Sequence, residues 1–254
     1  MSVDPLAEKY PGIGGYVYVA NNPVNAIDPD GRDIVYLNKV GSIIKVVNDG
    51  KSQIVIIDGG KTRLLSDYSI GRSWFGLNNR NRQVVANIGG YYGRKMEING
   101  VGASYVSSGI AHFDPKDNGI WIAPGVDGKV SSSLNDKNNL MNVLFHEGKH
   151  REDDLNGVNS TYESHASVYI SQMGNSSFSK ATEDFQDGMV GNMLNYIIGV
   201  ENIKVRGELI DNFNDTNVGG YKLDKSYRSG YGWGVSKNGG TKEYLNPVKP
   251  KSPN

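Results

Sequence analysis

Residues 133–157 read SLNDKNNLMNVLFHEGKHREDDLNG, and this stretch decides how the working part of the chain folds. Its first four residues fit a helix-capping pattern, and Gly157 is the kind of residue that ends a helix. Between these ends, apolar side chains recur at helical spacing on one face: Leu140, Val143 and Leu144. The stretch therefore predicts an amphipathic helix that packs against a hydrophobic core.

The same helix carries the sequence His146-Glu147-Gly148-Lys149-His150, an H-E-x-x-H motif. His146 and His150 are one helical turn apart, so both imidazoles project from one side and can share a cation at about 2.0–2.1 Å. Glu147 is rotated by about 100° from His146, which lets it reach a metal-bound water without ligating the metal. A carboxylate there takes the proton of the water as the water attacks a carbonyl. We therefore expect His146 and His150 to bind zinc and Glu147 to act as the catalytic base.

A third metal ligand is expected from the next predicted helix, residues 160–173. Glu163 is the preferred residue, and His165 is an alternative because imidazole is a common zinc ligand. Glu163 also fits a structural role, since Ser160 and Glu163 have the spacing of a capping box. If Glu163 is the ligand, His165 and Tyr162 become candidates for supporting the metal site or stabilising the transition state.

The composition of the 254 residues excludes several classes of protein. The chain has no cysteine, which rules out disulfide scaffolds, iron–sulfur sites and thiol catalysis. Its 27 Lys and Arg balance 27 Asp and Glu, so no basic excess favours a nucleic-acid partner. No apolar stretch is long enough for a membrane span, and the first ten residues lack the features of a signal peptide.

The rest of the chain predicts an α+β fold around the metal-binding helix. Residues 34–70 contain alternating apolar residues and turn signals, which indicate a β-meander that links the N-terminal segment to a working domain at residues 71–254. Within that domain, residues 118–123 read as a strand and residues 181–198 as a third helix. Residues 201–254 are rich in Gly and Tyr and read as strands and loops, from which a tyrosine is a further candidate for oxyanion stabilisation.

Residues 1–33 differ from the rest, with four of the nine prolines and several turn signals. The segment contains DPLAEKYPG, then YVYVANNPVN, then IDPDGRD. It resembles the closing segment of the Rhs repeat-associated core, in which a DPxG element joins a conserved shell to a variable C-terminal toxin. The resemblance implies that residues 1–33 are an Rhs-core remnant, and that the rest of the chain is a toxin delivered without a signal peptide, by a type VI-like or similar export route. It also implies a cognate immunity protein and a protein or peptide substrate in a target cell.

The H-E-x-x-H motif followed by Glu163-x-x-Ala166 resembles the glutamate-ligated zincin metallopeptidases over about residues 120–170. The resemblance implies a zincin-like domain with a metal-binding helix and a small mixed or antiparallel sheet, in which residues 118–123 form the edge strand that pairs with the substrate. It implies that His146, His150 and Glu163 hold Zn²⁺ and that Glu147 is the general base.

We therefore expect a zinc-dependent metallopeptidase that acts as the toxin tip of an Rhs-type protein. Two alternatives use the same residues differently. A metal-dependent nuclease toxin would use a His and carboxylate site on phosphodiesters, although no Lys or Arg stripe supports nucleic-acid binding. A non-enzymatic binding module would use the metal for stability alone, and would not need a glutamate at position 147.

Overall fold

The computed structural model describes residues 33–48, 50–73, 76–224, 232–240, 243–245, 247–250 and 252. Within these ranges the chain forms five α-helices and four small β-sheets, which gives the mixed α and β composition that the sequence predicts. The Rhs-like segment lies outside the described residues, apart from Asp33. None of the helices in these ranges combines the length and apolarity that a membrane span requires.

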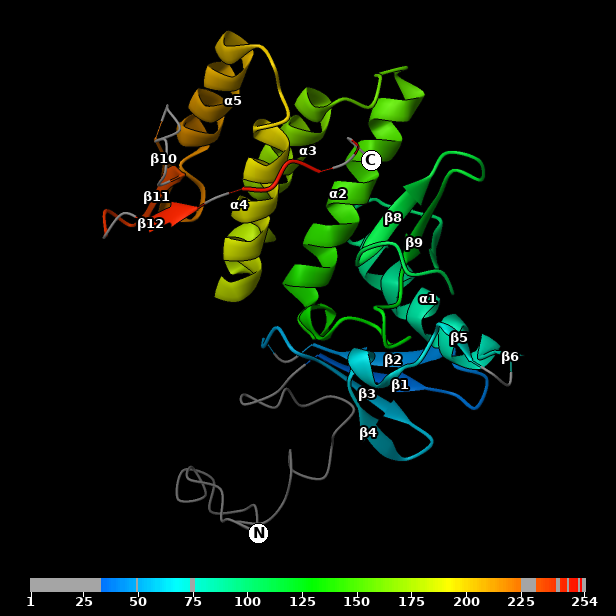
Figure 1. The fold of residues 1–254 in the computed structure, drawn as a ribbon. Coiled ribbons are helices and arrows are strands. Elements are labelled where there is room, and N and C mark those ends of the chain that lie inside the picture. The colour runs from blue at the N-terminus through cyan, green and yellow to red at the C-terminus, as the bar shows by residue number, and fades with distance from the viewer. Residues whose placement is uncertain are drawn as a thin grey trace, which may run out of the picture.

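The first sheet contains four strands and lies at the bottom of Figure 1: β1 (Asp33–Leu37), β2 (Ile43–Val47), β3 (Ile54–Asp58) and β4 (Lys61–Arg63). Its order is β2-β1-β3-β4, and β1 pairs with β3 in parallel. The sheet is therefore not the simple meander expected for residues 34–70, in which each strand would pair with the next along the chain. Its strands contribute Val35, Ile54 and Ile56 to the same core cluster as the helices, so the segment packs as part of the main fold.

Helix α1 (Asn79–Arg94) packs against a second sheet of β7 (Val101–Ala103), β8 (Ala111–Asp114) and β9 (Gly119–Ile122). Glycine makes this close approach possible, because a Cβ atom added at Gly89 would lie 2.7 Å from Cδ1 of Ile122. The strand order is β7-β9-β8, with β7 and β9 parallel and β8 and β9 antiparallel. The strand predicted at residues 118–123 is confirmed, but its expected place at an edge is wrong. It is paired on both sides, and β8 is the edge strand next to the helix that carries the H-E-x-x-H motif.

The helix that carries the H-E-x-x-H motif is α2 (Lys137–Leu155), which follows a single turn of 3₁₀ helix, η4 (Ser132–Asn135). Asp136 caps it, since its carboxylate accepts hydrogen bonds from the backbone N–H groups of Asn138 at 2.8 Å and Asn139 at 3.1 Å. Figure 1 shows α2 at the centre of the molecule, with β8 and β9 on one side and α3 on the other.

Three helices follow: α3 (Tyr162–Gly174), α4 (Glu183–Ile197) and α5 (Ile203–Thr216). The helices predicted at residues 160–173 and 181–198 are confirmed to within two residues at each end. Strands and loops were expected after residue 201; the strands occur from Tyr221 onward, but α5 occupies the first part of this range. Asn202 caps it by accepting from the N–H groups of Lys204 and Val205, and it buries Leu209, Ile210 and Phe213 on one face.

The smaller elements complete the periphery. The 3₁₀ turns are η3 (Leu65–Asp67), η5 (Phe178–Lys180) and η6 (Val218–Gly220). A short pair joins β5 (Arg72–Ser73) to β6 (Gly76–Leu77), and a last sheet has the order β10-β11-β12: β10 (Tyr221–Leu223), β11 (Trp233–Lys237) and β12 (Glu243–Leu245). These strands lie beside α4 and α5, on the far side of those helices from α2 (Figure 1).

Candidate metal centre and catalytic groups

Three histidines meet between α2 and α3. Helix α2 supplies His146 and His150, whose Nε2 atoms are 3.1 Å apart, and α3 supplies His165. One ring nitrogen from each of the three lies within 4.8 Å of the others. His146 is buried, and the other two are partly buried.

The three imidazoles fit a transition-metal ion. Two nitrogens bound to a tetrahedral zinc at 2.0–2.1 Å lie about 3.3 Å apart, close to the separation of the two Nε2 atoms. Gln172 accepts a hydrogen bond from Nδ1 of His146 at 2.9 Å, in the tautomer that leaves the Nε2 lone pair directed at the other histidine. Three nitrogen ligands with no sulfur suit zinc, and leave a fourth position open.

The protonation of the histidines also suits a metal. Burial, and then the nearby imidazoles of His150 and His165, hold the pKa of His146 well below its usual range. Burial and His165 lower the pKa of His150 to about 4. Both side chains are therefore neutral at neutral pH, which is the form that binds a metal.

The structure places His165, and not Glu163, beside the histidine pair. Residues two positions apart on a helix point about 200° apart, so only one of these two side chains can face α2. Glu163 lies in the first turn of α3 and is exposed to solvent. It lies outside the cluster of ligand atoms found among the described residues.

The capping box expected from Ser160 and Glu163 is displaced by one residue. Thr161 is the N-cap of α3, and its hydroxyl accepts from the N–H of Ser164 at 3.0 Å. The Ser164 hydroxyl in turn accepts from the N–H of Thr161 at 2.9 Å. Helix α3 therefore begins at Tyr162, and Glu163 takes no part in its cap.

Glu147 follows His146 on α2 and lies beside the edge strand β8. Its side chain is 8% exposed, and burial raises the pKa of its carboxyl to about 7, while a hydrogen bond from the backbone N–H of Phe113 acts in the opposite direction. A carboxyl with this pKa can take up a proton and release it again near neutral pH.

Strand β8 presents its free edge to this carboxylate. The N–H of Ala123 donates to the carbonyl of Ile110 at 3.0 Å, and polar groups alternate in direction along an antiparallel pair. Ile110 and His112 therefore direct their backbone groups toward β9, whereas Ala111 and Phe113 direct theirs outward. The bond from Phe113 to Glu147 agrees with this alternation.

Two tyrosines that the sequence analysis did not select surround the histidines. Tyr196 of α4 stacks on His165, with ring centroids 3.9 Å apart and planes at 7°. The Tyr169 ring on α3 lies 4.5 Å from the His146 ring. Burial is the main cause that raises the pKa of both phenols, and the charge of Glu147 raises them further, so both are neutral hydrogen-bond donors. Tyr169 was detectable, because it follows His165 by one helical turn.

Tyr162, a candidate from the sequence, occupies a different position. Its hydroxyl donates to the carbonyl of Pro250 at 2.8 Å, and its ring lies 6.4 Å from that of Tyr196. Asn195 of α4 accepts from the N–H of Val248 at 2.8 Å, so this C-terminal segment is attached to both helices. Tyr162 therefore belongs to the outer margin of the aromatic cluster and holds the C-terminal segment.

Comparison with known families agrees with this geometry. Residues 35–207 match the model of a family described as metallopeptidase toxin 2 (Tox-MPTase2), a range that includes α2, α3, α4 and the two sheets beside them. No significant match was found among curated proteins or among solved structures. The matched range covers more than half of the 254 residues, and the chain belongs to the metallopeptidase toxin 2 family.

Proposed function

We propose that this metallopeptidase toxin is a zinc-dependent peptidase in which His146, His150 and His165 hold the metal and Glu147 is the general base. The observation that carries the proposal is the position of a buried carboxylate, with a pKa of about 7, next to three converging imidazoles on the same helix pair. When bound, the metal would supply an electrophile that polarises the peptide carbonyl and lowers the pKa of water.

Residues of the chain would carry out proton transfer, orient the catalytic carboxylate and stabilise the oxyanion. Glu147 accepts the proton of the attacking water and passes it to the leaving amine. The N–H of Phe113 keeps the Glu147 carboxylate oriented beside β8. Tyr169 and Tyr196 are neutral phenols that border the histidines, and either can donate a hydrogen bond to the oxyanion that develops on the substrate.

We further propose that the substrate binds along the free edge of β8. The outward N–H and carbonyl of Ala111 and the outward carbonyl of Phe113 lie along the edge of β8 beside Glu147, and an extended peptide can pair with them as another strand. Main-chain pairing of this kind holds the scissile bond beside the catalytic carboxylate. It gives affinity with little dependence on sequence, so selectivity must come from pockets for the side chains.

The resemblance of residues 3–33 to an Rhs core supports a proposal about delivery. The toxin domain would be the C-terminal tip of an Rhs-type protein, exported by a type VI-like or similar route to act in a target cell. A producing cell would then need an immunity protein, which would inhibit the toxin by covering the catalytic groups beside β8.

The test compares the zinc-loaded wild type with Glu147→Gln on fluorescently labelled casein. We expect chelator-sensitive cleavage by the wild type and a loss of at least about a hundredfold in the variant, with the metal content unchanged. Glu163→Gln is the matched control, since it removes an exposed carboxylate and should leave the rate unchanged. Full activity in Glu147→Gln would refute the mechanism. Chelator-sensitive degradation of DNA or RNA, without cleavage of protein, would favour a nuclease instead.

A further inference from the structure

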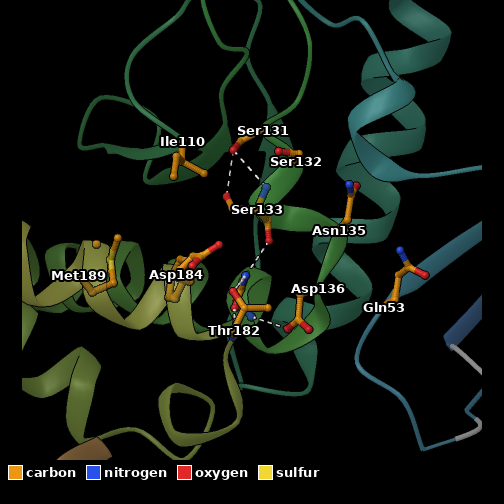
Figure 2. Close-up of a pocket in the computed structure, with 13 residues that line it drawn as sticks. Gln53, Ile110, Ser131, Ser132, Ser133, Asn135, Asp136, Thr182, Asp184 and Met189 are labelled. Atoms are coloured by element: carbon orange, nitrogen blue, oxygen red, sulfur yellow. Dashed lines mark hydrogen bonds between the residues drawn. The ribbon is translucent and has the colours of Figure 1, made fainter. Parts of the chain in front are cut away.

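A cavity of about 710 Å³ lies at the N-terminal end of α2, in the cleft between β8 and α4. Its walls come from the turn before α2, from the start of α2 and from the first two turns of α4, and Ile110 closes it on the β8 side (Figure 2). Its residues do not include the three histidines or Glu147. None of the roles assigned above uses this cavity.

The cavity continues from the proposed catalytic centre along two elements. On α2, Asn139 lines the cavity and precedes Glu147 by two helical turns, a distance of about 12 Å. Ile110, directly before the edge strand β8, lines the cavity and precedes Phe113 by three residues, a distance of about 10 Å. The distances along the two elements are similar. If an extended peptide binds along β8 with its scissile bond at Glu147, its side chain three residues from that bond reaches the cavity.

A series of direct contacts also connects the cavity to the three histidines. Met189 of α4 lines the cavity, and its Sδ lies 3.5 Å from Nε2 of Gln172. Gln172 accepts from the Nδ1 of His146 at 2.9 Å. The cavity and the three histidines are thus linked through Met189 of α4 and Gln172 of α3.

The chemistry of the cavity fits a long cationic side chain. Its lining contains the apolar side chains of Ile110, Phe185 and Met189, which suit an aliphatic stem. Two carboxylates line it, and no Lys or Arg does among the described residues. Asp136 is buried and caps α2, whereas Asp184 is exposed and forms no ion pair with any described residue.

Serine hydroxyl groups lie opposite Asp184 and form the other polar part of the cavity lining. Figure 2 shows the Asp184 carboxylate directed from α4 toward Ser133. The Ser131 and Ser133 hydroxyls are 2.9 Å apart, and the Ser133 carbonyl accepts from Asn139 at 2.9 Å, which holds this turn in place. An ammonium or guanidinium group between Asp184 and these oxygen atoms would have acceptors on both sides.

We propose that this cavity is a selectivity pocket for a Lys or Arg side chain of the substrate, three residues from the scissile bond, with Asp184 as its counter-ion. The proposal rests on the peptidase function proposed above. It assigns to this toxin a substrate class: extended segments with a basic residue at that distance from the cleaved bond.

The test digests a library of peptides derived from a bacterial proteome with the zinc-loaded full chain, and sequences the products by mass spectrometry. We expect Lys and Arg to be enriched three residues from the cleaved bond, on one side of it. A synthetic peptide with Lys at that position should have a kcat/KM about five- to tenfold above its norleucine counterpart. Asp184→Asn should remove this ratio, and Asp184→Lys should favour a Glu peptide instead.

Glu183→Gln is the matched control, because Glu183 is an acid in the same helical turn that does not line the cavity and pairs with Lys237. It should retain the wild-type ratio. Cleavage without a basic preference, or with a preference unchanged in Asp184→Asn, would overturn the pocket assignment alone. A zinc-loaded wild type that cuts no peptide in the library would overturn the peptidase function, and the role of the pocket with it.

Discussion

At the scale of single residues, the metal centre depends on which nitrogen of each histidine is free. Gln172 is fully enclosed, 1% exposed, and its side chain holds Nδ1 of His146 through one amide oxygen. Its Nε2 atom faces the Asn142 carbonyl at 3.4 Å and the Met189 sulfur, which keeps the amide in this orientation. Gln172 therefore directs the His146 lone pair toward the other two histidines, and would support a bound metal without being a ligand.

Replacing Gln172 with Leu should weaken zinc binding by about 10- to 100-fold, because His146 loses the acceptor that fixes its tautomer and ring orientation. The measurement is the Kd for zinc, from competition with a chromophoric chelator. Gln186→Leu is the control: Gln186 is also a buried glutamine, but it donates to the carbonyls of Phe178 and Ala181. Equal losses of affinity in the two variants would mean that general destabilisation, and not the tautomer, sets the affinity.

At the scale of elements, α1 is attached to the first sheet by an ion pair. Asp58, at the end of β3, is 7% exposed and accepts from both terminal nitrogens of Arg80, at 2.9 and 2.5 Å, and from the Tyr68 hydroxyl at 3.0 Å. The Arg80 hydrogen bond is the main cause that lowers the pKa of Asp58, although burial opposes it. The folded chain therefore favours the ionised carboxylate.

This shift predicts how stability depends on pH. A carboxyl whose pKa is lowered by folding stabilises the protein above the unfolded value of about 3.8, and this contribution is lost as the pH falls through the folded pKa. Asp58→Asn should lower the free energy of unfolding by about 1–2 kcal/mol at pH 7, a moderate value because Arg80 is 40% exposed. The difference between wild type and variant, from urea unfolding, should shrink between pH 5 and pH 3. A difference that is constant over this range would show that the charge of Asp58 does not stabilise the fold.

The elements also show how far the sequence predicts this structure. The helix of the H-E-x-x-H motif, the two helices after it and the strand at β9 are readable, because their apolar periodicity and caps are local. Helix α1 was not predicted, since Gly89, Gly90 and Gly93 weaken its helical pattern, and two of these glycines are needed for packing against β7 and β9. The edge position of β8 was not predictable either, because strand order depends on long-range pairing that no local pattern contains.

The sequence also predicts the candidate site only as far as local patterns allow. The spacing of His146, Glu147 and His150 within one helix was sufficient to place them together. The third histidine comes from a second helix, and the face that this helix turns toward α2 depends on packing between the helices, which no local pattern contains. Glu163 and His165 are therefore alternatives in the sequence, and the fold brings His165 to the histidine pair.

At the scale of the whole molecule, one buried ion pair joins three parts of the structure. Asp33 begins β1 and is fully buried. Its carboxylate accepts from Nζ of Lys137, at the start of α2, at 3.0 Å and from the Tyr92 hydroxyl of α1 at 2.9 Å. The first sheet, α1 and α2 are therefore fixed relative to one another at this point.

Asp33→Asn should destabilise the fold by about 2–4 kcal/mol, because it leaves the Lys137 ammonium, only 16% exposed, without its counter-charge. Urea unfolding of the full chain measures this change. Glu152→Gln, which breaks the i, i+3 pair with Lys149 on the surface of α2, should cost less than 1 kcal/mol. If the two variants were equally stable, Asp33 would not hold the sheet to the helices.

The most direct test of the account is the metal content of the purified full chain, by elemental analysis after zinc loading and desalting. The central claim is that His165 joins His146 and His150 in holding the metal. We predict about one zinc ion per chain in the wild type and in Glu163→Gln, and loss of the metal in His146→Ala and in His165→Ala. Retention of zinc in His165→Ala together with its loss in Glu163→Gln would contradict the three-histidine centre.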